Sequence, residues 1–331
     1  MIELRFSRAR GAEFGRRIGD ALAMPVHWYY NRGALRRDYG LVKDFQAPKE
    51  PHPDSIFWRS KWPAPRPELD ILGSERQFWG KHNVHYHRNL AAGENTLSGK
   101  LGTELWRSLS ACGGFDERDY LQRYVELLTH PERHRDTYLE EWHRGFFTNL
   151  GRGKKLEKCA IEEKHIGGLA VMTPVAIFYA DRYEDGSEQA LQCLKQTHAG
   201  RKMRVAAEAI LSLLVPVLQG ASLRETILEE IASQRNPYFG FPFRKWLSSA
   251  DDDVIGPRLS TACYLEDAVP AVIYLALKYS DEPEEGLIAN TNLGGDNVHR
   301  GSVLGALLGA ECGDKAWPQR WIEGLVDWEG S

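Results

Sequence analysis

Apolar residues recur along this chain at the spacing of buried or amphipathic helices. Segments 204–219 and 264–279 carry apolar side chains at nearly every turn position, which predicts two buried helices. Pro270 is compatible with the second helix because it lies near the helix start. Segments 119–129 and 187–195 have the pattern of amphipathic helices. Alternating runs of β-branched residues are almost absent, so the pattern predicts an all-α protein.

Two stretches interrupt the helical pattern. Residues 46–72 hold six of the sixteen prolines and two tryptophans, which predicts a long extended excursion. Residues 235–258 mix Arg, Asn, Pro and Gly with the aspartates of 251–253. Because aromatic side chains in both stretches need a surface to cover, we expect two ordered insertions on one domain spanning residues 1–331. The aspartate run is interpreted as a solvated loop, and cation binding is the less favoured alternative.

Composition narrows the class of protein. Of the 331 residues, 42% are hydrophobic and 27% charged, which excludes a disordered or collagen-like chain. The 42 Lys and Arg nearly balance the 46 Asp and Glu, so no nucleic-acid partner is expected. Five widely spaced cysteines without a CxxC pair favour a reducing compartment. The apolar stretches are too short to span a bilayer, so we expect a cytoplasmic protein without a membrane partner. The oligomeric state stays open.

Two series of glycines repeat every fourth residue. They are Gly11, Gly15 and Gly19, followed by Asp20, and Gly301, Gly305 and Gly309, preceded by Asp296. A glycine inside a helix costs about 0.5–1 kcal/mol relative to alanine, so six of them require compensation. Close approach of two helix backbones supplies it. We therefore expect helices 11–24 and 301–310 to pack by their glycine faces, with the two aspartates near one central cleft.

A set of short motifs then occurs in a characteristic order. They are 19–25 (GDALAMP), Gly167-Gly168-Leu169 before Met172-Thr173-Pro174, Thr197-His198 before Ala206-Ala207, 293–296 (LGGD) leading into 305–310 (GALLGA), and Trp317-Pro318 through Trp321. Together they resemble the ADP-ribosylglycohydrolase / crystallin J1 family, which includes dinitrogenase reductase-activating glycohydrolases. The match runs through nearly the whole chain. It implies a compact, orthogonally packed all-helical domain.

The resemblance also implies a metal site, and this chain departs from it. Family enzymes hold two magnesium ions between a Thr/Ser-Asp-Asp motif and an Asp-x-Asp-Thr/Ser motif. The corresponding segments are 96–98 (TLS) and 296–299 (DNVH), so only Thr96 and Asp296 match. Magnesium requires oxygen donors in a near-octahedral array, and leucine and valine provide none. We therefore expect no metal cofactor, and a conventional magnesium-dependent hydrolase is the less favoured alternative.

Polar side chains are concentrated where the first metal motif falls. Segment 82–98 contains His82, His85, His87, Arg88, Glu94, Asn95, Thr96 and Ser98, and the second motif contains Asp296, Asn297, His299 and Arg300. Cleavage of an N-glycosidic ribosyl bond passes through an oxocarbenium-like state that requires a base for water and nearby charge stabilisation. Glu94 and Asp296 are the predicted carboxylate pair, with His85, His87 or His299 as the acid.

Substrate-binding residues are predicted around this pair: Asp20, His27, Tyr29, Asn95, Thr96, Ser98, Gly294, Gly295 and Asn297. The aromatic run at 27–30 either stacks on a substrate ring or belongs to the core.

Several structural interpretations of the same residues stay open. In one interpretation His82, His85 and His87 bind zinc, although no fourth ligand is evident. In the other, they support an interface or a neighbouring group. The structural alternative for segment 94–96 is the cap of one helix, and that for Asp296 is the cap of another. His198 orients a helix.

The favoured hypothesis is a metal-independent, ADP-ribosylglycohydrolase-like hydrolase that cleaves a glycosidic or similarly polar bond of a small molecule. The alternative is an inactive relative that acts as a binding or crystallin-like protein. A decayed site has no reason to accumulate three histidines, Glu94 and Asn95, so the enzyme is preferred. Segments 82–98 and 293–300 should then converge on one cleft.

Overall fold

The computed structural model describes residues 2–130, 133–181 and 183–326. Helices dominate these residues, which confirms the all-α prediction. The α-helices are α1 (Ile2–Ala23), α2 (Arg32–Tyr39), α3 (Leu97–Cys112), α4 (Glu117–Thr129), α5 (Glu141–Gly151), α6 (Gly167–Phe178), α7 (Tyr183–Leu194), α8 (Arg201–Leu218), α9 (Leu223–Ser233), α10 (Phe243–Trp246), α11 (Asp251–Val254), α12 (Leu265–Lys278), α13 (Pro283–Asn292), α14 (Asn297–Cys312) and α15 (Gln319–Gly324). Short 3₁₀ turns are η1 (Met24–Val26), η2 (Phe57–Arg59), η3 (Pro67–Leu69), η4 (Gly73–Phe78), η5 (Leu156–Lys158), η6 (Pro237–Phe239) and η7 (Asp314–Ala316). Strands β1 (Ile161–Glu162) and β2 (His198–Ala199) pair in parallel.

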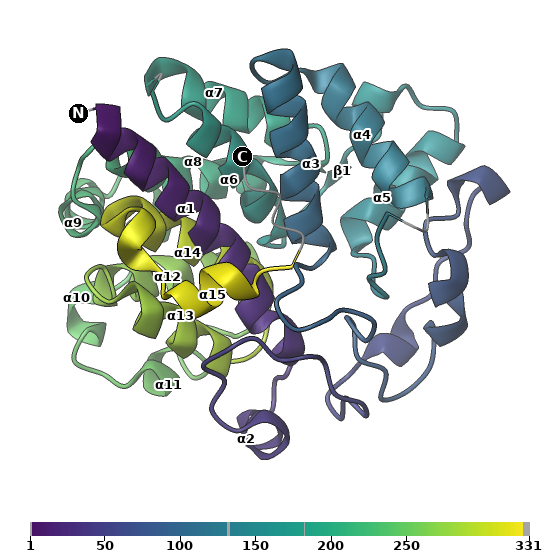
Figure 1. Ribbon diagram of the computed structural model, residues 1–331, viewed down its shortest axis with the longest axis horizontal. Helices are drawn as coiled ribbons and strands as arrows, with labels where there is room; N and C mark the ends of the chain where they lie inside the picture. Colours follow the sequence, from purple (N-terminus) through teal and green to yellow (C-terminus); the bar gives the residue numbers. More distant parts are fainter. Residues whose placement is uncertain (1, 131–132, 182, 327–331) are drawn as a thin grey trace.

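Helices α1 and α14 pack against each other at the centre of the molecule (Figure 1). A Cβ atom on Gly15 would lie 2.0 Å from the carbonyl oxygen of Gly305, and one on Gly19 would lie 2.1 Å from that of Gly301. Gly11 meets Gly309 in the same way, at 2.3 Å. The predicted glycine-to-glycine packing is therefore confirmed, and it places the start of α14 beside the end of α1.

The other helices surround this central pair. Predicted helices 204–219 and 264–279 correspond to α8 and α12, and the apolar residues of α12 are buried along its length. Predicted helix 119–129 corresponds to α4, and 187–195 falls largely within α7. Helices α3 and α6 pack together beside α1, whereas α12 and α13 pack against α14. None of the helices described is long and apolar enough to cross a membrane.

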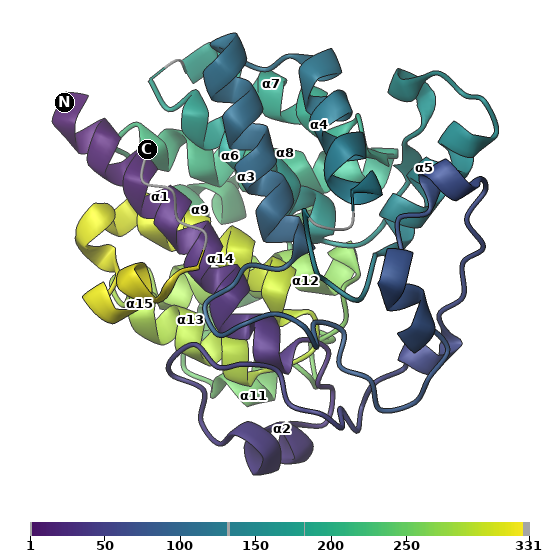
Figure 2. The same ribbon diagram turned by 45° about the vertical axis from the view of Figure 1, so that its right-hand side comes forward.

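The proline-rich excursion is ordered and wraps one side of the fold. Between α2 and α3 the chain follows a long path that contains only 3₁₀ turns (Figures 1 and 2). Phe57, in its middle, is fully buried against Trp28, Val84 and Tyr86. Burial of aromatic side chains thus holds the excursion against the helical body.

The second irregular stretch folds into short helical turns. Asp251, at the start of α11, accepts hydrogen bonds from the hydroxyls of Tyr274 and Tyr279, and Lys278 donates to it at 2.7 Å. The solvated-loop interpretation is therefore wrong for Asp251, whose carboxylate ties this stretch to α12. Asp252 and Asp253 are exposed, as that interpretation expects, but they belong to α11 rather than to a loop.

Candidate active site

A pocket of about 290 Å³ lies between the excursion, the segment before α5 and the start of α14. Its aromatic lining consists of Trp28, Tyr30, Tyr86, Tyr138 and Trp142, and its charged or titratable lining of Arg59, Glu140, Glu141, Arg144, His165, Cys263, Asp296 and His299. Ile56, Ser60 and Gly167 complete it. Because Ile56, Arg59 and Ser60 belong to the proline-rich excursion, that excursion forms one wall of the pocket.

A double-glycine turn sets the position of Asp296. Gly294 and Gly295 have φ values of 68° and 67°, which glycine adopts without steric cost. The N–H of Gly295 donates to the carbonyl of Tyr29, and a Cβ on Gly295 would lie 2.0 Å from the carbonyl oxygen of Thr261. Neither glycine lines the pocket, so their predicted substrate-binding role is not supported by their position. They allow close backbone packing that brings Asp296 into place.

Asp296 is buried and receives two histidines on a single oxygen. His27 Nε2 lies 3.0 Å and His299 Nδ1 2.7 Å from Asp296 Oδ1. Burial alone would raise the pKa of Asp296, but His299 and His27 outweigh it and hold the pKa well below its usual value. Asp296 Oδ2 is buried and has no partner among the described residues. The carboxylate is therefore ionised at neutral pH, with one oxygen unused by the protein.

His299 joins Asp296 to a second carboxylate. Its Nε2 lies 2.9 Å from Glu140 Oε1 and 3.0 Å from the hydroxyl of Ser98. Burial opposes the charged imidazole, but the two carboxylates raise the pKa of His299 well above its usual value. His299 in turn keeps the pKa of Glu140 well below its ordinary range. At neutral pH this trio carries two negative charges and one positive charge.

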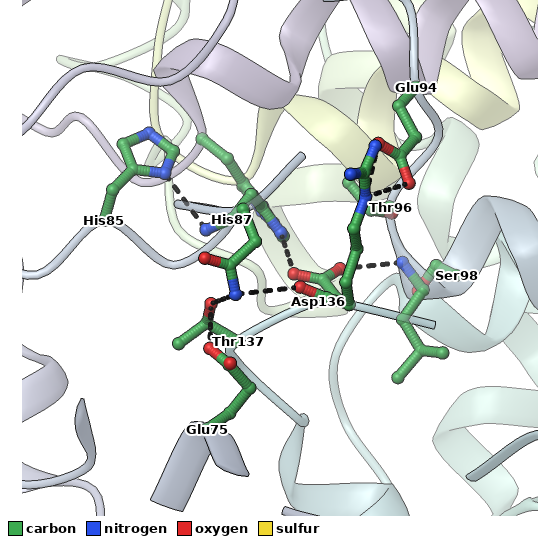
Figure 3. Close-up of polar contacts among 12 residues, drawn as sticks. Glu75, His85, His87, Glu94, Thr96, Ser98, Asp136 and Thr137 are labelled. Carbon is green, nitrogen blue, oxygen red and sulfur yellow. Dashed lines mark hydrogen bonds and ion pairs between the residues drawn. The ribbon is translucent and has the colours of Figure 1, made fainter. Parts of the chain in front are cut away.

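A chain of side chains extends behind Asp296, on the other side of His27. His27 Nδ1 lies 2.7 Å from His87 Nε2, and His87 Nδ1 lies 2.7 Å from Asp136 Oδ1. Figure 3 shows the His87 ring directed at Asp136, whose other oxygen accepts the N–H of Leu97 at 2.8 Å. Burial lowers the pKa of His27 to about 4, so His27 is neutral at pH 7. This chain fixes the orientation of His27 toward Asp296.

Glu94 is not brought to the pocket. Lys100 Nζ and Arg135 Nη2 each lie 2.6 Å from its carboxylate, and the N–H of Ala91 donates to it at 3.0 Å. In Figure 3 it stands apart from the His87–Asp136 pair. Burial would raise the pKa of Glu94, but the two cations lower it below its usual value. The predicted pairing of Glu94 with Asp296 is therefore wrong, because the Glu94 carboxylate is used in a structural ion pair.

Three other predicted binding residues form a separate buried cluster around Asp20. The Thr96 hydroxyl donates to Asp20 Oδ2 at 2.6 Å, and Asn95 Nδ2 donates to Asp20 Oδ1 at 2.9 Å. Burial raises the pKa of Asp20 despite these bonds. None of the three lines the pocket, so they join α1 to α3 rather than form its wall.

The remaining predicted residues divide between the pocket and the core. Ser98 and His27 contact pocket residues directly, whereas Tyr29 is fully buried and stacks on His52 at 4.0 Å. In the run 27–30, Trp28 and Tyr30 line the pocket, whereas Tyr29, the residue predicted to bind substrate, does not. Asn297 Nδ2 donates to the carbonyl of Thr291, away from the pocket lining.

The histidines that were predicted to have structural roles differ in their contacts. His85 accepts the N–H of His87 on Nδ1 and lies 3.0 Å from the carbonyl of Pro25, so it supports the chain without lining the pocket. His82 is exposed and stacks on Trp58, which excludes shared zinc binding by the three histidines. His198 is buried against Trp142 and pairs with the hydroxyl of Thr197. Thr96 and Asp296 occupy N-cap positions of α3 and α14, but neither side chain makes a capping hydrogen bond.

Sequence reasoning missed four residues that define the site: Asp136, Glu140, Trp142 and His165. The first three lie within 134–143 (HRDTYLEEWH), a segment richer in His, acidic and aromatic residues than 82–98. This composition is the feature of the sequence that could have identified the segment as part of the site. His165 follows two glutamates just before α6 and carries no motif.

The residues present do not fit a pair of magnesium ions. Leu97 belongs to the main apolar core, and Val298 is buried with Ala23, Met24 and Leu90. The Thr96 hydroxyl is already bonded to Asp20. One group in the described part of the chain has single-metal spacing: His27, Asp296 and His299, with ligand atoms within 4.8 Å of one another. Imidazole–carboxylate hydrogen bonds account for its contacts.

Comparisons with known proteins agree with this fold. The ADP-ribosylglycohydrolase family model matches residues 1–330. A solved structure entitled "ADP-ribosylglycohydrolase-related protein complex" is similar, with a TM-score of 0.65 and 22% sequence identity. The alignment covers 98% of this chain and 94% of that one. A search of curated proteins gave no significant match. From its helical fold and the whole-length family match, the chain belongs to the ADP-ribosylglycohydrolase family.

Proposed function

We propose that this protein is a metal-independent hydrolase that cleaves a glycosidic bond of a small molecule in the pocket beside Asp296. One observation carries the proposal: a buried, ionised carboxylate lines the pocket and keeps one oxygen, Oδ2, without a partner among the described residues. A buried polar atom without a partner is costly. A water or a substrate hydroxyl supplies the missing donor.

The charge of the Asp296–His299–Glu140 trio suits a glycosidic transition state. Asp296, His299 and Glu140 together carry one net negative charge, which favours the positive charge that develops on an oxocarbenium-like carbon. Aromatic side chains such as Trp28 and Trp142 provide flat apolar walls for a ring. The pocket therefore combines ring binding with stabilisation of a cation.

Asp296 is the proposed general base. Oδ1 is held by His27 and His299, so Oδ2 is the oxygen that takes a proton from the attacking water. His299 keeps Asp296 and Glu140 ionised and in position. Glu140 is fixed in turn by the indole N–H of Trp142, at 2.5 Å.

The proposal includes independence from metal, because Leu97 and Val298 lie in apolar clusters and the Thr96 hydroxyl is bonded to Asp20. Protein treated with EDTA should hydrolyse its substrate as fast as untreated protein. Dependence of the rate on added Mg²⁺ would contradict this part of the proposal.

The test uses p-nitrophenyl α- and β-D-ribofuranosides as probes, with release of p-nitrophenolate as the signal. Asp296→Asn should lower kcat by about 10²–10⁴-fold, the usual contribution of a general base. Asp253→Asn, the same change at an exposed position, is the matched control and should leave kcat unchanged. Binding of both ribosides without hydrolysis by the wild type would instead support the inactive relative.

A further inference from the structure

Hydrolysis of a glycosidic bond requires a proton for the leaving group as well as a base for water. His299 is poorly suited to deliver it, because Asp296, Glu140 and Ser98 surround its two ring nitrogens. Burial raises the pKa of Cys263, and a tyrosine such as Tyr30 has an ordinary pKa of about 10, so neither group donates a proton readily near neutral pH. His165 is the remaining imidazole in the pocket lining.

The Glu163 carboxylate holds His165 by its ring nitrogen Nδ1. Its Nδ1 lies 2.6 Å from Glu163 Oε1, and that same oxygen accepts the N–H groups of Lys164 at 2.7 Å and His165 at 3.1 Å. The Glu163 side chain is 3% exposed and that of His165 is 24% exposed. The carboxylate is thus fixed in the protein, while the imidazole is accessible from the pocket.

The backbone around this pair is also fixed. The N–H of Ile166 donates to the carbonyl of Cys263 at 2.9 Å, and the N–H of Leu265 donates to that of Lys164 at 3.0 Å. These bonds clamp segment 163–166 against the start of α12 on both sides of His165. A catalytic side chain on so rigid a support keeps a defined direction.

We propose that His165 is the general acid of this site and that Glu163 is its positioning residue. The inference rests on the proposed glycosidic hydrolysis. Because Glu163 engages Nδ1, Nε2 is the nitrogen that meets the substrate.

The proton balance of the reaction is complete with these groups. The bond between the anomeric carbon and the leaving-group atom breaks, and its electron pair takes the proton from His165 Nε2. The oxygen of water forms the new bond to the anomeric carbon, and the proton of that water passes to Asp296 Oδ2. Proton exchange with solvent then returns His165 to imidazolium and Asp296 to carboxylate.

The charges around His165 favour the protonated form. Burial would lower the pKa of His165, but Glu163, together with Asp296 and Glu140 across the pocket, raises it above the usual 6.5. Tyr264 stacks obliquely on the ring at 5.3 Å, with Lys164 above that tyrosine, and His198 of β2 is the nearby imidazole. These contacts favour the protonated imidazole that the proposed acid role requires.

The experiment compares leaving groups in the wild type and in His165→Gln. p-Nitrophenol leaves without help from an acid, whereas an alkyl alcohol does not. We expect H165Q to lower kcat/KM for a methyl ribofuranoside by about 10²–10⁴-fold and for the p-nitrophenyl riboside by less than about tenfold. His130→Gln, at an exposed position, is the matched control and should alter neither rate.

Glu163→Gln provides the second readout. Loss of the paired carboxylate should lower the pKa of His165, seen both as a downward shift of the alkaline limb of kcat/KM and in a substrate-free NMR titration of the imidazole. Equal losses on both ribosides in H165Q, or an unchanged His165 titration in E163Q, would overturn the inference while the Asp296→Asn result still stood. A wild type that hydrolyses neither riboside would overturn both proposals.

Discussion

Replacement of Gly15 by alanine would place a methyl group inside the contact between α1 and α14. The new Cβ would lie 2.0 Å from the carbonyl oxygen of Gly305 and 2.5 Å from the Trp317 ring. Real Cβ atoms essentially never approach other heavy atoms within 3.0 Å, so the helices must separate locally by about 1 Å. Because the neighbour is backbone, no side-chain rotation relieves the clash.

The expected loss follows from two opposing terms. Overpacking of a well-packed core costs about 1–3 kcal/mol or more, and alanine recovers about 0.5–1 kcal/mol of helix propensity. The glycine contact repeats along the helix pair, so separation also loosens its neighbours, and we expect a net loss of about 2 kcal/mol in the free energy of unfolding. With an unfolding entropy of about 2.1 cal/mol/K per residue, this loss lowers Tm by about 3 °C.

The assay is urea unfolding followed by circular dichroism, with calorimetry for Tm. Gly33→Ala, at an exposed position of α2, is the control and should change the free energy of unfolding by less than about 1 kcal/mol, because its Cβ would meet only the Asn31 side chain at 3.1 Å. The double variant with Gly305→Ala should cost less than the sum of the two single changes, since one separation relieves both clashes. Additive losses, or a Gly15→Ala protein as stable as the wild type, would refute this account of the packing.

Three further changes test other parts of the structure. Glu94→Gln should lower the free energy of unfolding at pH 7 by about 1–3 kcal/mol through loss of the ion pairs with Lys100 and Arg135. Because the folded pKa of Glu94 lies below 4.5, this stabilisation is present above pH 4.5 and is lost as the pH falls through the folded pKa, so urea unfolding at about pH 3 should show a smaller difference. Val298→Asp should cost more than about 3 kcal/mol by placing a carboxylate among apolar side chains, and Mg²⁺ should not restore Tm; recovery with Mg²⁺ would mean that a metal site persists. Asp136→Asn should lower riboside kcat about tenfold with little change in KM, because it releases the chain that orients His27; an unchanged kcat would show that this chain has no catalytic effect.

The helical elements were predictable because their signals are local. A run of apolar residues predicts a buried helix such as α12. The glycines spaced i, i+4 at 11–19 and 301–309 predict a close backbone partner for each helix. The pairing of these two helices followed because each series lacked any other compensation. The pocket residues Asp296 and His299 were found in another way, because they fall in the segment that resembles the family's second metal motif.

Side-chain direction in irregular segments was not predictable. Glu94 and Glu140 both precede helices in polar, aromatic segments, yet one carboxylate meets Lys100 and Arg135 while the other meets His299. Without a helical or strand period, nothing in the order of residues states which side of the backbone faces the pocket. Tyr29 points to the core and its neighbours Trp28 and Tyr30 line the pocket for the same reason.

The sequence by itself thus determined the helical class and the central glycine contact. Only the tertiary structure decided which acidic and imidazole groups share a site, because segments 27–30, 134–143 and 163–166 lie far from Asp296 along the chain. The ion pair between Asp296 and His299 lies within one turn of a helix, so it is encoded locally. The contacts of Asp296 with His27, and of His299 with Glu140, depend on where the long loops pack, and packing is a property of the whole chain.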